Sequence, residues 1–213
     1  MEAFLQDSRL DIYSNTLIEK GNMYNLTAIS PEDFRELHYR DSLELLNVAD
    51  FAGKRVIDVG SGAGFPGVPL KLAVPEMELV ALDATKKRSE FLRLLGKRLG
   101  IKYEVIWDRA EETARNPEYR ESFDIAVSRA VSGMTILSEM CLPFVKPGGV
   151  FLAHKGSGIS EELEAARETI ELLGGKIREV RPYFRGNIVV VEKTAQTPEL
   201  YPRKWKKISS GKK

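Results

Sequence analysis

Four glycines lie directly after a short apolar run in the stretch VIDVGSGAGFPGVPLKLA, residues 56–73. They are Gly60, Gly62, Gly64 and Gly67. Glycine allows backbone torsions and a close approach to a ligand that a Cβ would forbid. Asp83 follows about 20 residues later, at a position where an acid can hydrogen-bond ribose hydroxyls. The spacing predicts a nucleotide-like ligand, and by itself it is compatible with NAD, FAD or S-adenosylmethionine.

Three neighbouring features favour S-adenosylmethionine. Asp58 ends the apolar run, and a buried carboxylate that faces the loop would repel a pyrophosphate but accept a sulfonium or a bridging water. Pro66 and Pro69 fall in the expected first helical turn, where they remove N–H groups that a pyrophosphate would use. The Pro-Gly-Gly turn at residues 147–149 is common in the S-adenosylmethionine-dependent methyltransferase fold. The loop is therefore interpreted as a methyltransferase cofactor site.

Two further stretches acquire roles in such a site. Ala110 and Glu111 follow the third expected strand, where this fold contacts adenine, although acids also suit a plain helix N-terminus. Ser128-Arg129-Ala130 ends the fourth expected strand, where many amino-group methyltransferases carry Asn/Asp-Pro-Pro-Tyr/Phe. That motif is absent, and Arg129 instead places a cation at the reaction site, unless it forms an ordinary surface ion pair. A ring nitrogen with a free lone pair needs no help in losing a proton, so the absence favours such an acceptor.

The elements that position these residues alternate between short apolar runs and helical stretches from Arg55 onward. Strands are expected at 55–60, 77–83, 103–107, 123–130 and 148–156, and helices at 67–74, 85–100, 132–145 and 159–175. Two further strands, at 176–183 and 185–194, are close enough in sequence to pair antiparallel. The pattern predicts an α/β fold with a doubly wound, mostly parallel, seven-stranded Rossmann-like sheet.

The chain is expected to form a single methyltransferase domain over residues 1–213. An N-terminal helical extension (1–52) precedes the core (53–193), and a basic tail (194–213) that is mobile near its end follows it. Ser30 with Pro31 predicts a helix start. That helix would pass through His38 and continue toward residue 51.

Composition sets limits on the class of protein. The 213 residues are 43% hydrophobic and 30% charged, with a net charge of +1, so total charge indicates no partner. The single cysteine, Cys141, excludes a disulfide framework and is expected to be a small buried residue. No stretch suggests a signal peptide or a membrane span, no metal site is expected, and a cytoplasmic, monomeric protein is predicted.

The sequence resembles a known family, the bacterial 16S ribosomal RNA guanine-N7 methyltransferases (RsmG, also called GidB). The resemblance covers nearly the whole chain and rests on the motifs YNLTAI (24–29), DVGSGAGFPGVPL (58–70), KKRSEFL (86–92), RAE (109–111), SRAV (128–131), HKG (154–156) and YPR (201–203), with His38 and DSL (41–43). One departure is Leu37, where the family often has arginine. The resemblance implies cofactor contacts by Gly60, Phe65, Ala110, Glu111 and Arg129, with Asp83 as a ribose partner. It also implies a substrate guanine in the decoding region of 16S rRNA on the small ribosomal subunit.

Substrate-side candidates come from both ends of the chain: Asn25, Thr27, His38, Asp41, Lys155 and Arg203. His38 and Asp41 would share a helix face, although such a pair can also be purely structural. The segment RKWKK (203–207) combines cations with an aromatic, which suits RNA phosphates and bases but also a solubilising end.

The expected activity is transfer of a methyl group from S-adenosylmethionine to guanine N7, by in-line attack without a general base. Arg129 is the one residue expected to take part in catalysis. A methyltransferase acting on protein or a small metabolite, and a non-catalytic nucleotide-binding regulator, remain as alternatives.

Overall fold

The computed structural model describes residues 1–24 and 26–210 of the chain. The expectations for Asn25 and for the mobile end of the tail, at residues 211–213, lie outside the described residues. The described part forms a sheet with the order β3-β2-β1-β4-β5-β7-β6. Its strands are β1 (Arg55–Val59), β2 (Glu78–Asp83), β3 (Glu104–Trp107), β4 (Phe123–Arg129), β5 (Val145–Lys155), β6 (Gly175–Tyr183) and β7 (Gly186–Lys193). The helices are α1 (Arg9–Tyr24), α2 (Asp41–Leu43), α3 (Gly67–Ala73), α4 (Lys86–Leu99), α5 (Ala110–Thr113), α6 (Met134–Cys141), α7 (Ser160–Leu172) and α8 (Trp205–Ser209).

The direction of the strands confirms the expected doubly wound sheet. β1 pairs parallel with both β2 and β4, and β2–β3 and β4–β5 are parallel as well. β7 pairs antiparallel with β5 and β6, which gives the expected antiparallel end. Because chain order reverses between β1 and β4, the carboxyl ends of these two strands flank the crevice where such sheets bind ligands.

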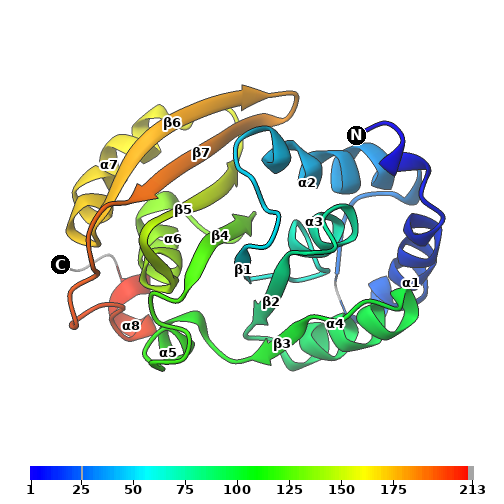
Figure 1. The fold of residues 1–213 in the computed structure, drawn as a ribbon, viewed down its shortest axis with the longest axis horizontal. Coiled ribbons are helices and arrows are strands. Elements are labelled where there is room, and N and C mark those ends of the chain that lie inside the picture. Colours follow the sequence, from blue (N-terminus) through cyan, green and yellow to red (C-terminus); the bar gives the residue numbers. More distant parts are fainter. Residues whose placement is uncertain (25, 211–213) are drawn as a thin grey trace.

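Helices flank the sheet (Figure 1), and an apolar core lies on each of its two faces. One core joins the N-terminal helices, α3 and α4 to the sheet, and it includes Tyr13, Phe65 and Phe91. The other joins α5, α6 and α7 to the opposite face, and it includes Phe123 and Phe151. Phe91, Leu92, Leu95 and Leu99 of α4 are all buried, as their helical spacing predicts.

The N-terminal segment after α1 is helical but irregular. A 3-10 turn (Pro31–Asp33) leads into a π-helical segment (Arg35–Arg40), then α2 and a second 3-10 turn (Glu44–Asn47). Ser30 lies at the predicted N-cap, but its hydroxyl donates to the Asp33 carboxylate at 3.0 Å instead of accepting from the backbone. Wide helical turns of this kind often occur at functional sites.

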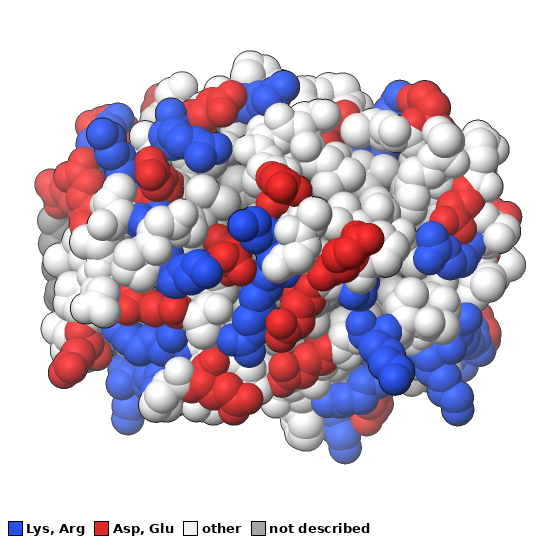
Figure 2. Space-filling model, viewed as in Figure 1, with Lys and Arg blue, Asp and Glu red and all other residues white. Residues whose placement is uncertain are grey.

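The part of the tail that the structure describes packs against the rest of the molecule. The chain returns to the molecule after β7, and α8 buries Ile208 against it. Cys141 is buried, as predicted, and burial raises the pKa of its thiol. Positive and negative side chains are interspersed on the face drawn in Figure 2, consistent with the net charge of +1. None of the described helices is long and apolar enough to cross a bilayer.

Candidate active site

The glycine loop joins the carboxyl end of β1 to α3. Gly60 has φ +76°, and a Cβ there would lie 2.6 Å from the Val131 side chain. Gly62 has φ +56°, and a Cβ there would meet nothing closer than a carbonyl at 3.8 Å, so it would point into open space. The Gly62 N–H donates to the Asp83 carboxylate at 2.9 Å, and Asp83 also accepts from the Thr85 N–H at 2.8 Å. Asp83 therefore fixes the loop against the end of β2.

Asp58, at the buried end of β1, stabilises the glycine loop from the protein interior. Its side chain is fully buried, and one oxygen accepts from the Gly67 N–H at the start of α3, at 3.0 Å. The other oxygen has no hydrogen-bond partner within the described part of the chain. Burial raises the pKa of this carboxyl to about 7. The expectation that Asp58 faces the ligand is corrected, since Asp58 lines neither of the cavities described next, both taken over the described residues.

Two cavities open at the carboxyl ends of the central strands. The first has a volume of about 470 Å³ and is lined by Leu26, Thr27, Ala28, Ile29, His38, Asp41, Gly60, Ser61, Gly62, Ala63, Phe65, Arg88, Arg129, Ala130, His154, Lys155, Gly156, Tyr183 and Arg185. The second, about 420 Å³, is lined by Val59, Gly60, Leu82, Asp83, Ala84, Thr85, Arg88, Asp108, Arg109, Ala110, Glu111, Ala130, Val131, Met140 and Trp205. Both share Gly60, Arg88 and Ala130, so an elongated ligand could extend from one into the other. Ala130 has φ +55°, an uncommon conformation for a non-glycine residue that often marks functional sites.

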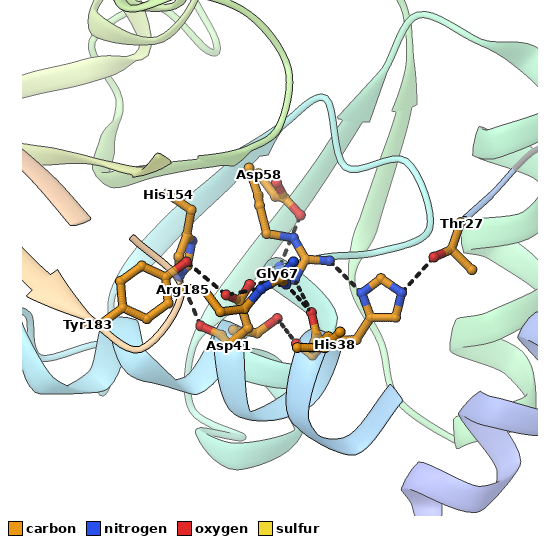
Figure 3. A network of polar contacts seen from close by, with 11 residues as sticks. Thr27, His38, Asp41, Asp58, Gly67, His154, Tyr183 and Arg185 are labelled. Atoms are coloured by element: carbon orange, nitrogen blue, oxygen red, sulfur yellow. Dashed lines mark hydrogen bonds and ion pairs between the residues drawn. The ribbon is translucent and has the colours of Figure 1, made fainter. Parts of the chain in front are cut away.

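A buried polar network forms the wall of the first cavity, and we call it the cavity network (Thr27, His38, Asp41, Arg129, His154 and Tyr183). Arg129, at the end of β4, donates to the Asp41 carboxylate at 2.6 Å and contacts His38 Nδ1 at 2.8 Å. His38 Nε2 lies 2.8 Å from the Thr27 hydroxyl. Figure 3 shows Thr27 beyond the His38 ring, on the side away from Asp41.

Asp41 forms hydrogen bonds with the remaining members of the network. Its second carboxylate oxygen accepts from the Tyr183 hydroxyl at 2.8 Å and lies 3.7 Å from the Arg185 guanidinium. Its backbone carbonyl accepts from His154 Nε2 at 2.9 Å. The N-terminal segment, the ends of β4 and β5, and the end of β6 with its following turn thereby meet at one residue, Asp41 (Figure 3). The expected sharing of one face by His38 and Asp41 is observed, because both contact Arg129.

An aromatic stack supports this wall. The Phe65 ring lies between Tyr13 at 5.0 Å and His38 at 4.1 Å, with both pairs nearly coplanar. The Arg129 guanidinium lies 4.8 Å from the centre of the same ring. Such stacking restricts the orientation of both His38 and Arg129.

Both histidines of the chain are in the cavity network, and both are neutral near pH 7. Burial, and to a smaller extent the nearby Arg129 cation, lowers the pKa of His38 to about 3. Burial likewise lowers the pKa of His154 to about 4. Neither ring is therefore an effective general base.

The second cavity contains a polar group that lacks a partner. Glu111 is 1% exposed and pairs with Arg109 through one oxygen, while the other has no partner among the described residues. The Arg109 guanidinium lies 4.5 Å from the Trp205 ring of α8, so the tail supplies part of this wall. A ligand that carries a hydrogen-bond donor would satisfy the Glu111 carboxylate.

The structure brings most of the predicted residues to the two cavities. Gly60, Gly62, Phe65, Arg129, Thr27, His38, Asp41 and Lys155 line the first, and Asp83, Ala110 and Glu111 line the second. Lys155 is already paired, with the Ser132 carbonyl at 2.9 Å and Glu162 at 2.6 Å.

Two predicted residues lie away from the cavities, which corrects their expected roles. Gly64 has φ +97°, and a Cβ there would clash with the Tyr13 hydroxyl, so its missing side chain allows packing and not ligand approach. Arg203 forms an ion pair at 2.7 Å with Glu139, which is 1% exposed, and this pair fixes the tail to α6. Neither residue lines either of these two cavities, as taken over the described residues.

Sequence reasoning did not select Arg88, Tyr183, Arg185 or Trp205 as site residues. Arg88 lies in the motif KKRSEFL (86–92), and Trp205 lies in the segment RKWKK (203–207). Their cationic and aromatic side chains were the signal by which they could have been found. No local pattern indicates that the turn holding Tyr183 and Arg185 packs next to Asp41, 142 residues from Tyr183.

Comparisons with known proteins agree with this geometry. Residues 6–187 match the family model described as GidB, rRNA small subunit methyltransferase G. A ribosomal RNA small subunit methyltransferase G from Desulfitobacterium hafniense (strain Y51) is 42% identical over 207 residues, covering 93% of this chain and 86% of the relative. One from Acetivibrio thermocellus is 41% identical, covering 94% of this chain and 87% of the relative.

Solved structures are similar at the level of the fold. The T. thermophilus 16S rRNA N2 G1207 methyltransferase, in complex with AdoMet and guanosine, aligns with a TM-score of 0.55 at 17% identity, over 78% of this chain and 41% of that one. A ribosomal protein L11 methylase from Lactobacillus delbrueckii aligns with a TM-score of 0.58 at 14% identity, over 80% and 83%.

Proposed function

Because the chain belongs to the family described as rRNA small subunit methyltransferase G, we propose that it methylates N7 of one guanine in the 16S ribosomal RNA of the small subunit. Its enzyme class, S-adenosylmethionine-dependent methyltransferase, follows from the family and the fold. The observation that carries the proposal is the pair of adjoining cavities at the β1–β4 crevice, one with an unpartnered acid and the other with the cavity network.

The residues of the second cavity fit an adenosine group. Asp83 stands where an acid can bind ribose hydroxyls, and the free oxygen of Glu111 can accept from an exocyclic amine. Gly62 leaves the approach to the first cavity open, since a Cβ there would meet nothing closer than a carbonyl at 3.8 Å. When bound, S-adenosylmethionine supplies an electrophilic methyl group on a sulfonium. Gly60, Arg88 and Ala130 line the passage between the cavities, so the reacting end would lie near Arg129.

The first cavity fits an acceptor that has no proton to lose. Guanine N7 carries an in-plane lone pair, so methylation there requires alignment and not a base. The histidines that line the cavity have pKa values of about 3 and about 4, too low for general-base work near neutral pH. Asp58, whose pKa is about 7, is buried behind the loop and lines neither cavity over the described residues. The Arg129 guanidinium, held by Asp41 and Phe65, forms a rigid wall against which the base can be positioned.

The direct test uses small subunits from cells that lack this modification. The protein is incubated with them and with S-adenosylmethionine labelled in the methyl group, and the labelled nucleotide is mapped. We expect one labelled guanine, with the label on N7. Label on another atom, on a ribosomal protein or on nothing would overturn the proposal.

Deleting residues 198–213 would not separate an RNA substrate from other substrates. The deletion removes Trp205 from the second cavity and leaves the buried Glu139 carboxylate without Arg203. A loss of activity would then follow from damage to the cofactor cavity, whatever the substrate is.

A further inference from the structure

A chain of two hydrogen bonds runs from Arg129 through His38 to Thr27, and its direction is fixed. A guanidinium has only donors, so His38 Nδ1 must accept from Arg129 across their 2.8 Å contact. The imidazole is then neutral with its hydrogen on Nε2, because a hydrogen on Nδ1 would face the Arg129 N–H. His38 Nε2 therefore donates to the Thr27 hydroxyl at 2.8 Å.

The same hydroxyl accepts a second hydrogen bond. The backbone N–H of Ile29 donates to Thr27 Oγ1 at 3.0 Å. A hydroxyl has two acceptor positions and one hydrogen. Both acceptor positions are occupied, so the remaining capacity of Thr27 is donation alone. No acceptor for this hydrogen occurs among the described residues, and Thr27 is half-buried at the edge of the first cavity.

A guanine presents two adjacent acceptors, N7 and O6, on the edge that would face this cavity. Adenine presents N7 beside an amino group, which is a donor. A hydroxyl that can only donate would bind O6 and oppose the adenine amine. Resting on the function proposed above, we infer that Thr27 is a specificity-determining residue, whose hydroxyl donates to O6 of the target guanine while N7 receives the methyl group.

The first experiment examines the enzyme alone. Nitrogen-15 NMR of the histidine rings should show His38 as a neutral imidazole with its hydrogen on Nε2 at pH 7. A hydrogen on Nδ1, or a protonated ring at that pH, would overturn the inference because the direction of the hydrogen bonds would be lost.

The second experiment couples Thr27 to O6. Small subunits are reconstituted with 16S rRNA that carries either guanosine or 2-aminopurine ribonucleoside, which lacks O6, at the position mapped above. On the guanosine RNA, we expect Thr27→Val to lower kcat/KM by about 10- to 100-fold, since it leaves O6 without a donor. Thr27→Ser should restore most of this loss. On the 2-aminopurine RNA, the wild type and Thr27→Val should differ by less than about threefold.

Controls separate this role from others. Thr169→Val, on α7 and outside both cavities, is the matched control and should leave kcat/KM unchanged. An equal loss for Thr27→Val on both RNAs would overturn the inference and indicate a structural role through His38. A weakening of S-adenosylmethionine binding to Thr27→Val by about tenfold, measured by calorimetry, would overturn it by assigning the hydroxyl to the cofactor. Failure of the wild type to label N7 on the guanosine RNA would instead reject the proposed function, and the inference with it.

Discussion

Two regions of the molecule bury a cation beside a carboxylate, and they use it differently. In the cavity network, Arg129 pairs with Asp41 at 2.6 Å and the network borders a cavity. Under the tail, Lys193 is fully buried, and its ammonium contacts Glu121, two backbone carbonyls and Thr197, all within 2.9 Å. We call this second region the tail cluster (Glu121, Glu139, Gly174, Lys193, Thr197 and Arg203).

The difference lies in unused hydrogen-bonding capacity. The ammonium of Lys193 has three hydrogens and four acceptors around it, so nothing is left for a ligand. In the cavity network, the Thr27 hydroxyl has no acceptor for its hydrogen among the described residues, and Thr27 lines a cavity of about 470 Å³. A buried ion pair alone thus does not identify a site. A polar group that lines a cavity and lacks a hydrogen-bond partner is the stronger indication of a site.

The largest effect is expected from Lys193→Met. Removing the ammonium takes the cation from the Glu121 carboxylate, which then keeps only the Thr197 N–H as a donor, and takes a donor from buried backbone carbonyls. We therefore expect a loss of about 3–5 kcal/mol in the free energy of unfolding. Urea denaturation provides the measurement. S-adenosylmethionine binding by the protein that remains folded should be unchanged, and a loss below about 1 kcal/mol would show that the tail cluster is less important to stability than its contacts indicate.

The next comparison is between Gly62, which lines the first cavity, and Gly174 of the tail cluster. In Gly62→Val the new side chain points toward the first cavity, and we expect the Kd for S-adenosylmethionine to rise by about 100-fold. At Gly174, with φ +80°, a Cβ would clash with the Ala195 backbone carbonyl, so Gly174→Val should destabilise the fold instead. Calorimetry with each folded variant distinguishes them, and equal affinities for the cofactor would contradict the assignment of Gly62.

Arg129→Ala should affect activity more than stability. We expect kcat/KM to fall by more than about tenfold, because the wall that positions the base is lost. The Asp41 carboxylate keeps the Tyr183 hydroxyl at 2.8 Å and Arg185 at 3.7 Å, so destabilisation should be smaller than for Lys193→Met. Arg129→Lys, which retains the charge but not the planar guanidinium, tests whether shape or charge matters. An unchanged rate for Arg129→Ala would exclude this residue from the site.

The smallest effect is the pH dependence of stability. The pKa values of His38 and His154 are lowered to about 3 and about 4 in the folded protein, so unfolding takes up protons below the ordinary histidine pKa of about 6.5. Their contribution is present above pH 6.5 and is lost as pH falls toward 4. Asp58 acts in the opposite direction, because its raised pKa of about 7 makes the folded protein take up a proton between pH 7 and 4.

Unfolding measured between pH 4.5 and 7.5 can resolve these contributions. Asp58→Asn should steepen the loss of stability in acid, and His38→Asn should reduce it, each by at most about 1.4 kcal/mol per pH unit. The double variant Lys193→Met with Glu121→Gln, in the tail cluster, should shift the whole curve without changing its slope. A slope unaffected by His38→Asn would contradict the assigned pKa.

The sheet could be predicted from the sequence because its information is local. Alternating apolar runs and helical stretches locate the strands, and the glycines locate the ligand crevice. The packing partners of Asp41 could not be predicted in the same way, since Arg129 and Tyr183 reach it from 88 and 142 residues away. Arg203 illustrates the opposite difficulty. A basic tail predicts RNA contact by composition, whereas the partner of Arg203 is the buried Glu139.

The two cavities take their outer walls from opposite ends of the chain. Thr27 and His38 precede β1, whereas Trp205 follows β7, so both segments lie outside the stretch of chain that forms the sheet. Each cavity is therefore complete only when a segment from outside the sheet has packed against the strand ends. We expect a change in one of these segments to alter one cavity while the sheet and the other cavity remain.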